Sequence, residues 1–272
     1  MQRKRVLIIG SGPAGLAAAM YTARAQLNPI VIAGDLLGGQ VSQTHEIENY
    51  PGFPDTLSGA ELVDNFKNHA ERFGTEIVYD MVEEVDFANG SPFTVKTTNE
   101  TYLADTVIIT IGASQRHLNV HGEKELTKFA NSVDIIHRRD QLRAGAALQS
   151  RAMKNAKISF TWDTVPEEIT AGDDGTVKSI KLRNVKTNEI EDRDIDGIFI
   201  FIGHTPNNRL FGKQLKMTDN GYLVTDELYK TSVEGVFAAG EIQDQIWRQV
   251  STSVGQGSAA AISAIRWLDE HE

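Results

Sequence analysis

Three glycines near the start of the chain, Gly10, Gly12 and Gly15, have the spacing of a loop that binds the pyrophosphate of a dinucleotide. In such a loop the first glycine permits a tight turn, and the second lets the backbone approach the phosphates. The third allows a helix to pack closely against a strand. A glycine-rich turn with a purely structural role is the alternative, and the surrounding sequence decides between the two.

The elements around this loop are those that a dinucleotide site needs. In the stretch 5–9, Arg5 is followed by a continuous apolar run, which is typical of a buried parallel strand. Pro13 and Ala14 lead from the loop into a helix-forming stretch at 16–24, and a second apolar run follows at 29–33. Strand, glycine loop, helix and strand in about 30 residues favour nucleotide binding, with the phosphates at the helix N-terminus.

The acidic residue that usually holds a ribose at the end of the second strand is missing. Ala33 and Gly34 stand at that place, and Asp35 follows them. Asp35 or backbone groups hold the ribose on one interpretation, and on the other Asp35 is only a turn residue.

Composition excludes several classes of function. The chain has 272 residues, with 27 Lys and Arg against 37 Asp and Glu, so its formal charge is −10. This charge disfavours nucleic acid or an anionic membrane as a partner. No apolar run approaches the roughly 20 residues of a membrane span, and the first residues lead into a strand rather than a signal peptide, so we expect a cytoplasmic protein. The seven histidines lack metal-ligand spacing, so we predict no metal site.

The chain contains no cysteine. This excludes disulfides, thiolate nucleophiles, cysteine-ligated metal clusters and any dithiol relay. No other side chains have the arrangement of a nucleophile with its base, so we assign no catalytic residue.

Several motifs together resemble those of the low-molecular-weight thioredoxin reductases, FAD-dependent members of the pyridine nucleotide–disulfide family. The resemblance extends over nearly the whole chain. The motifs lie at residues 38–40 (Gly-Gly-Gln), 48–54 (Glu-Asn-Tyr-Pro-Gly-Phe-Pro), 104–113, 137–140 (His-Arg-Arg-Asp), 203–207 (Gly-His-Thr-Pro-Asn), 235–241 and 247–249 (Trp-Arg-Gln).

The resemblance implies an α/β fold in which a Rossmann-like FAD domain is built from N- and C-terminal segments. We expect these segments at 1–117 and 206–272, with a truncated NADPH-type domain inserted at 118–205. Helices are predicted at 59–73, which is amphipathic, and at 251–268, which is rich in small residues. We also predict strands at 107–111 and 236–239, which end at glycines close to the ligand.

The resemblance also implies the residues that contact FAD. Glu241 stands where the family has Asp, so its contact with the ribityl chain is one methylene longer. Arg248 is a flavin contact or a solvated charge, and Asn49 is a flavin-side amide or a loop cap. The implied set, beyond Gly10, Gly12, Pro13, Ala14, Gly15 and Asp35, is Gly39, Gln40, Asn49, Val82, Gly112, Gly240, Glu241, Arg248, Gln249 and Val250.

The middle of the chain departs from the family pattern. After residues 123–125 a family member would continue with Cys-x-x-Cys, a strand and a second glycine loop. Here 126–130 reads as the last turns of a helix, and a strand follows at 133–136. Roughly 30 residues, which form the front half of a βαβ unit, are therefore missing together with the dithiol.

This departure makes NADPH binding doubtful. Arg138 and Arg139 match the pair that binds the 2′-phosphate of NADPH, but the loop for its pyrophosphate is absent. The alternative for both arginines is a solvated basic surface, which we favour.

The remaining strands of the inserted domain are predicted at 158–162, 177–182 and 197–202, with a hairpin turn at 173–175. Loss of the central strand leaves two possibilities. Strand 133–136 pairs directly with 198–202, or the domain is rearranged.

These features predict an FAD-binding flavoprotein, expected to be a homodimer, that cannot reduce thioredoxin with NADPH. Residual flavin chemistry would be slow oxidase turnover or exchange with a protein electron donor or acceptor. A non-catalytic FAD-binding protein, or a deletion form of an ordinary NADPH-dependent thioredoxin reductase, are the alternatives.

Overall fold

The computed structural model describes residues 1–115, 132–173, 175–200 and 202–271. These residues form two compact units, one of Met1–Ser114 with His204–Glu272 and the other of Gln115–Gly203. The predicted domain boundary at 117/118 and the predicted helix turns at 126–130 lie outside the described residues.

Unit 1 is built on one mixed sheet. Its strands follow the order β3-β2-β1-β6-β5-β4, and β14 also pairs with β6. The pairs β1–β2, β2–β3, β1–β6 and β6–β14 are parallel, whereas β4–β5 and β5–β6 are antiparallel. The bounds are β1 Gln2–Ile9, β2 Ile30–Ile32, β3 Glu76–Val78, β4 Val82–Asp86, β5 Phe93–Thr97, β6 Thr101–Ile109 and β14 Val236–Ala238.

The apolar run predicted at 5–9 is buried on both faces of this sheet. Leu7 and Ile9 belong to one apolar core and Val6 and Ile8 to the other, because successive side chains of a strand point to opposite faces. This is the pattern of a central parallel strand. The α/β fold expected from the sequence is therefore confirmed.

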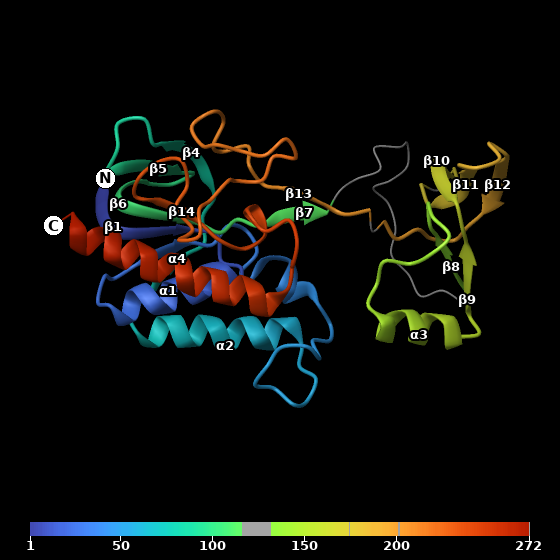
Figure 1. Ribbon diagram of the computed structural model, residues 1–272, viewed down its shortest axis with the longest axis horizontal. Coiled ribbons are helices and arrows are strands. Elements are labelled where there is room, and N and C mark those ends of the chain that lie inside the picture. Colours follow the sequence, from blue (N-terminus) through green and yellow to red (C-terminus); the bar gives the residue numbers. More distant parts are fainter. Residues whose placement is uncertain (116–131, 174, 201, 272) are drawn as a thin grey trace. The chain divides into compact units, whose positions relative to one another are not determined.

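Three helices gather on one side of this sheet (Figure 1). They are α1 (Pro13–Arg24), α2 (Gly59–Arg72) and α4 (Val250–Glu270), close to the predicted 16–24, 59–73 and 251–268. Helix α4 packs directly on α1: a Cβ added to Gly257 would lie 2.0 Å from the carbonyl oxygen of Ala14. The small residues of both helices permit this approach, which joins the N- and C-terminal segments.

Unit 2 consists of smaller pieces. One is a βαβ unit, in which β8 (Val133–Ile136) pairs in parallel with β9 (Ile158–Thr161) after helix α3 (Ala146–Lys154). The other is an antiparallel sheet in the order β10-β11-β12, with bounds Thr164–Ala171, Val177–Asn184 and Ile190–Asp194. A two-stranded sheet that belongs to unit 1, apart from Gln115, pairs β7 (Ala113–Gln115) with β13 (His204–Pro206).

The strand predicted at 197–202 is wrong for its described residues. Residues 197–200 have no strand conformation, and Phe199 is 60% exposed. Ile198 and Ile200 pack against the small core of unit 2, so these apolar side chains contribute to the core although residues 197–200 form no strand. β8 pairs with β9 and, among the described residues, not with 197–200. The strand predicted at 133–136 is confirmed.

The hairpin predicted around 173–175 is confirmed in its described residues. β10 and β11 are antiparallel, and Gly175 adopts the left-handed conformation that the turn requires (φ 76°). The hairpin of unit 2 therefore forms as its local sequence predicts. The strand predicted at 197–202, which needs a partner distant in sequence, does not form in its described residues.

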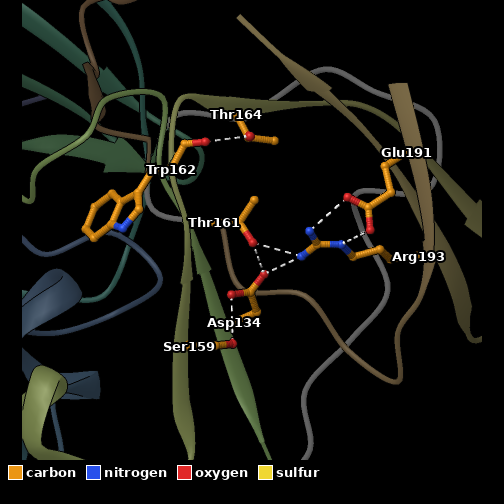
Figure 2. A network of polar contacts seen from close by, with 7 residues as sticks. All are labelled: Asp134, Ser159, Thr161, Trp162, Thr164, Glu191 and Arg193. Carbon is orange, nitrogen blue, oxygen red and sulfur yellow. Dashed lines mark hydrogen bonds and ion pairs between the residues drawn. The ribbon is translucent and has the colours of Figure 1, made fainter. Parts of the chain in front are cut away.

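A polar network joins the two pieces of unit 2 (Figure 2). Asp134 of β8 accepts hydrogen bonds from the hydroxyls of Ser159 (2.8 Å) and Thr161 (2.6 Å) on β9. Arg193 of β12 donates to the carboxylate of Asp134 (2.7 Å) and forms a forked pair with Glu191. A charged side chain from the antiparallel sheet thus ties it to the βαβ unit.

Candidate functional site

The glycine loop between β1 and α1 has two tight positions and one open position. A Cβ on Gly10 would lie 2.7 Å from the carbonyl oxygen of Thr110, and one on Gly15 would lie 2.0 Å from that of Gly10. A Cβ on Gly12 would have only the Thr110 oxygen nearby, at 4.0 Å. The backbone at Gly10 and Gly15 is therefore tightly packed, whereas the backbone at Gly12 leaves room for a ligand among the described residues.

Gly12 is also the N-cap of α1, followed by Pro13 at the first helical position. No side chain caps this helix end, and its first turn carries no acidic residue. Its free N–H groups and the positive end of the helix dipole suit an anionic group.

The segment after β2 is attached to the same loop. The Ser11 hydroxyl donates to the carbonyl of Ala33 (2.9 Å), and the Gly38 N–H donates to the carbonyl of Ser11 (3.1 Å). Between these anchors Asp35 is exposed, in a bend. Its position leaves open both interpretations, a ribose contact and a turn residue.

Gly112 lies just beyond β6, in a second backbone segment of the candidate site. It has φ 62°, and a Cβ placed on it would meet nothing within 4 Å. Gln40, in a short 3-10 helix (η1, Gly39–Gln43), donates from its side chain to the carbonyl of Ala113. Asn207 donates from its backbone to the carbonyl of Gly112 (3.1 Å) and from its side chain to that of Ile111 (2.9 Å).

The C-terminal segment reaches the start of α1 through Gly240. This residue has φ 77° and would bring a Cβ within 3.0 Å of the Ala14 Cβ. Its N–H donates to the side-chain oxygen of Gln256 on α4 (3.0 Å). Gly240 opens a short 3-10 helix, η2 (Gly240–Ile242), that carries Glu241 beside the glycine loop.

Asn49 and Gln249 are 200 residues apart in sequence and meet in the structure. The Asn49 amide donates to the Gln249 side-chain oxygen at 3.1 Å. Gln249 caps α4 in a reciprocal arrangement with Thr252, and Val250 is the first residue of the helix. The N- and C-terminal parts of the predicted cofactor set are thus in direct contact.

Glu241 lies in an unfavourable place for a charge. Burial raises the pKa of this carboxyl, and the positive charges of His204 and Arg248 act in the opposite direction. Asp244 adds a further raising effect through its negative charge. Burial is the largest of these effects, so the charged form of Glu241 is disfavoured relative to that of an exposed glutamate.

The pKa of Asp244 is shifted in the opposite direction, because its hydrogen bonds outweigh the effect of burial. Burial opposes its ionised form, but the backbone N–H groups of Trp247, Ile246 and Arg248 and the Gln256 amide donate to it, and they hold its pKa below the ordinary value. Two buried nitrogens near Glu241, His204 Nδ1 and Arg248 Nε, have no hydrogen-bond partner among the described residues.

Sequence reasoning missed four residues of this neighbourhood. His204 and Asn207 lie in the Gly-His-Thr-Pro-Asn motif, which by itself predicts no separate role for either residue. Tyr222, whose hydroxyl accepts from Arg248 Nη2 at 2.9 Å, and Asp244 give no local signal, because their partners are brought in by the fold.

The remaining predicted residues lie elsewhere. Val82 is the first residue of β4 and its side chain is buried in the core, so only its backbone remains for a ligand. Arg138 and Arg139 follow β8 in unit 2 with exposed side chains.

The described residues contain neither a membrane-spanning helix nor a metal-binding cluster. No helix there is long and apolar enough to cross a membrane. Within the same residues, no group of three or more histidines and carboxylates is arranged to hold a metal ion.

Comparison with known proteins places the chain among disulfide oxidoreductases. The family model described as pyridine nucleotide-disulphide oxidoreductase matches residues 4–131 and 124–257. The thioredoxin reductase of Rickettsia typhi is 41% identical over 306 residues, covering 98% of this chain and 98% of the relative. That of Streptomyces coelicolor is 39% identical over 304 residues, covering 97% and 94%.

Solved structures agree. Lactococcus lactis thioredoxin reductase gives a TM-score of 0.93 at 35% identity, covering 98% of this chain and 99% of that one. A ferredoxin-flavin thioredoxin reductase from Clostridium acetobutylicum gives 0.61 at 26% identity, covering 99% of each. The chain therefore belongs to the pyridine nucleotide-disulphide oxidoreductase family, as a thioredoxin reductase-like flavoprotein.

Proposed function

We propose that unit 1 binds FAD and that the chain does not reduce disulfides with NADPH by the dithiol route. The observation that carries the first part is the convergence of three backbone segments near the start of α1: the glycine loop, Thr110 just after β6, which lies against Gly10 and Gly15, and Gly240, which lies against Ala14. Among the described residues, an added Cβ at Gly12 would have only the Thr110 oxygen within 4.0 Å. The direct hydrogen bond between Asn49 and Gln249 supports a single site made from both segments.

The residues present fit a flavin dinucleotide. The uncapped start of α1 would hold the pyrophosphate, with Gly12 open to it. Gln40, Asn49, Glu241 and the Arg248–Val250 stretch would surround the remainder of the cofactor. When bound, FAD supplies two-electron redox chemistry, and the chain's own groups bind and orient it.

The absence of cysteine supports the second part. Transfer of electrons to a protein disulfide requires a thiolate that attacks sulfur and forms a mixed disulfide. With no cysteine in the 272 residues, no side chain of this chain can form that intermediate.

The NADPH site also lacks support. The alignment with the Rickettsia typhi reductase spans 306 residues and the chain has 272, so at least 34 positions of that relative have no counterpart here. The two family matches overlap at 124–131, which is where we expect the missing segment. The β8–α3 connection carries Arg138 and Arg139 but only one glycine, Gly145.

A matched pair of substitutions tests FAD binding. Gly12 and Gly145 are both N-caps with extended backbone and no crowding of an added Cβ, so Asp fits at either place and caps the helix. We expect Gly12→Asp to purify folded but without flavin, because its carboxylate repels the phosphates. Gly145→Asp should retain one FAD per chain.

The measurement is the flavin content of each purified protein by absorbance after acid release. A colourless wild-type protein that cannot be reconstituted with FAD would refute the proposal. Yellow Gly12→Asp protein with full flavin content would show that the pyrophosphate does not bind at this loop.

We propose further that the chain is a homodimer and exchanges electrons with a protein donor or acceptor. The resemblance supports the dimer, and the similarity to a ferredoxin-flavin thioredoxin reductase supports a protein donor. Sedimentation of the flavin-loaded protein tests the first. Anaerobic bleaching of its flavin by reduced ferredoxin tests the second.

A further inference from the structure

Arg248 has a backbone conformation that side chains other than glycine rarely adopt. Its φ is 49°, in the left-handed region, just before α4 begins. Such a conformation is unfavourable and is kept where the surroundings enforce it, commonly at functional sites. Two sets of contacts enforce it here.

The first set fixes the backbone. The Asp244 carboxylate is 5% exposed and accepts N–H groups from Ile246 (2.8 Å), Trp247 (2.9 Å) and Arg248 (3.2 Å). It also accepts from the Gln256 amide (3.1 Å), which anchors it to α4. The loop is therefore closed around one buried carboxylate.

The second set fixes the side chain. Arg248 donates from Nη2 to the Tyr222 hydroxyl at 2.9 Å, and its guanidinium lies 5.8 Å from the centre of the Tyr222 ring. Tyr222 itself is 4% exposed, so its ring cannot move freely. The hydrogen bond and the cation–π contact together hold the guanidinium in one place.

One buried donor of Arg248 has no partner in this arrangement. Arg248 Nε is buried and has no hydrogen-bond partner among the described residues. A buried guanidinium N–H without an acceptor is costly, and it points to an acceptor that a ligand supplies. The charge of Arg248 also acts on Glu241, one of the expected FAD contacts.

We propose that Tyr222 is a positioning residue that presents Arg248 to the bound flavin dinucleotide, with Asp244 fixing the backbone. This inference rests on the proposed binding of FAD by unit 1. Tyr222 is distant from the glycine loop in sequence, and in this proposal it affects FAD binding only through Arg248.

A double-mutant cycle tests it, with the dissociation constant of FAD as the readout. The full-length protein is stripped of flavin and titrated with FAD. Tyr222→Phe keeps the ring and removes the hydroxyl that accepts from Arg248, and we expect affinity to fall about tenfold. Tyr229→Phe, at a tyrosine packed against the core that contains Ala14 and Trp267, should bind like wild type.

The cycle is completed by Arg248→Met, which should weaken binding at least tenfold. Tyr222→Phe should then add nothing in the Arg248→Met background, because its effect passes through the guanidinium. Arg248→Lys replaces Met in the cycle if the Met variant does not fold.

Wild-type affinity in Tyr222→Phe, or an undiminished tenfold loss on top of Arg248→Met, would overturn the positioning role while leaving FAD binding intact. A wild-type protein that binds no FAD would overturn the proposed function itself.

Discussion

The two units of this chain differ in how their strands find partners. In unit 1, β1 pairs along its length with β6 and also with β2, and two large apolar cores cover the faces of the sheet. In unit 2 the described strands form separate small sheets, and four buried residues make up the core: Ile169, Val177, Ile180 and Leu182. Polar contacts such as Arg193–Asp134 contribute to joining them.

The proposed loss of a central strand would account for this difference. Parallel strands depend on neighbours far away in sequence, whereas a hairpin needs only its own turn. Unit 2 keeps the β10–β11 hairpin and one βαβ unit, and segment 197–200 has no ladder. Unit 1 therefore has one continuous sheet, whereas the described strands of unit 2 form separate small sheets.

The largest expected effect tests the close packing of unit 1. Gly257→Ala places a Cβ 2.0 Å from the Ala14 carbonyl oxygen, so α4 must move away from α1, at about 2–3 kcal/mol. Gly255→Ala, two residues away in the same helix, meets nothing within 4 Å and should stabilise by up to about 1 kcal/mol. Urea unfolding measures both. Equal effects would show that the two helices are not in contact.

The polar link in unit 2 gives the next effect. Arg193→Met removes the donor to Asp134 and should loosen β8 and β9 by about 1 kcal/mol, because a charge-assisted hydrogen bond is lost. Hydrogen exchange of the β8 and β9 amides measures it. Lys181→Met breaks an exposed pair with Glu168 and should change the exchange less. Flavin content should be unchanged in both variants. A loss in either would contradict the expectation that FAD binding by unit 1 does not depend on these contacts in unit 2.

The hairpin of unit 2 gives an effect of similar or smaller size. Gly175→Ala forces a side chain into φ 76°, at about 1 kcal/mol, and should increase exchange of the β10 and β11 amides. Gly197→Ala meets nothing within 4 Å and should leave exchange unchanged. Protection lost equally in both variants would mean that 197–200 belongs to the same folded element as the hairpin.

The smallest effect concerns pH in unit 1. Because burial raises the pKa of Glu241 in the folded state, the folded flavin-free protein loses stability as pH rises from 4.5 through the raised value. Glu241→Gln should remove this loss and unfold at a slightly higher temperature at pH 7. Asp244 acts with the opposite sign: its lowered pKa gives stability that is lost as pH falls below 3.8. A steeper loss of stability above pH 4.5 in Glu241→Gln would contradict the assignment.

The sequence was sufficient for the elements whose signal is local or doubly buried. The runs at 5–9 and 29–33 and the glycine spacing predicted β1, β2 and α1, since burial on both faces needs apolar residues at every position. The prediction at 197–202 failed because an apolar run does not reveal whether a neighbouring strand exists.

The candidate site shows the same limit. Gly12, Gly240 and Asn49 carry motifs that a reader can recognise in the sequence. Tyr222 and Asp244 do not, because their importance lies in hydrogen bonds to Arg248 that exist only after folding. Positioning residues of this kind are found from contacts.

The most direct test is anaerobic titration of the purified yellow protein, first with NADPH and then with dithionite. The contrast between the two units predicts that stoichiometric NADPH leaves the flavin absorbance unchanged and that dithionite bleaches it. Bleaching by one equivalent of NADPH would contradict the account, because it would require unit 2 to retain a working nicotinamide site.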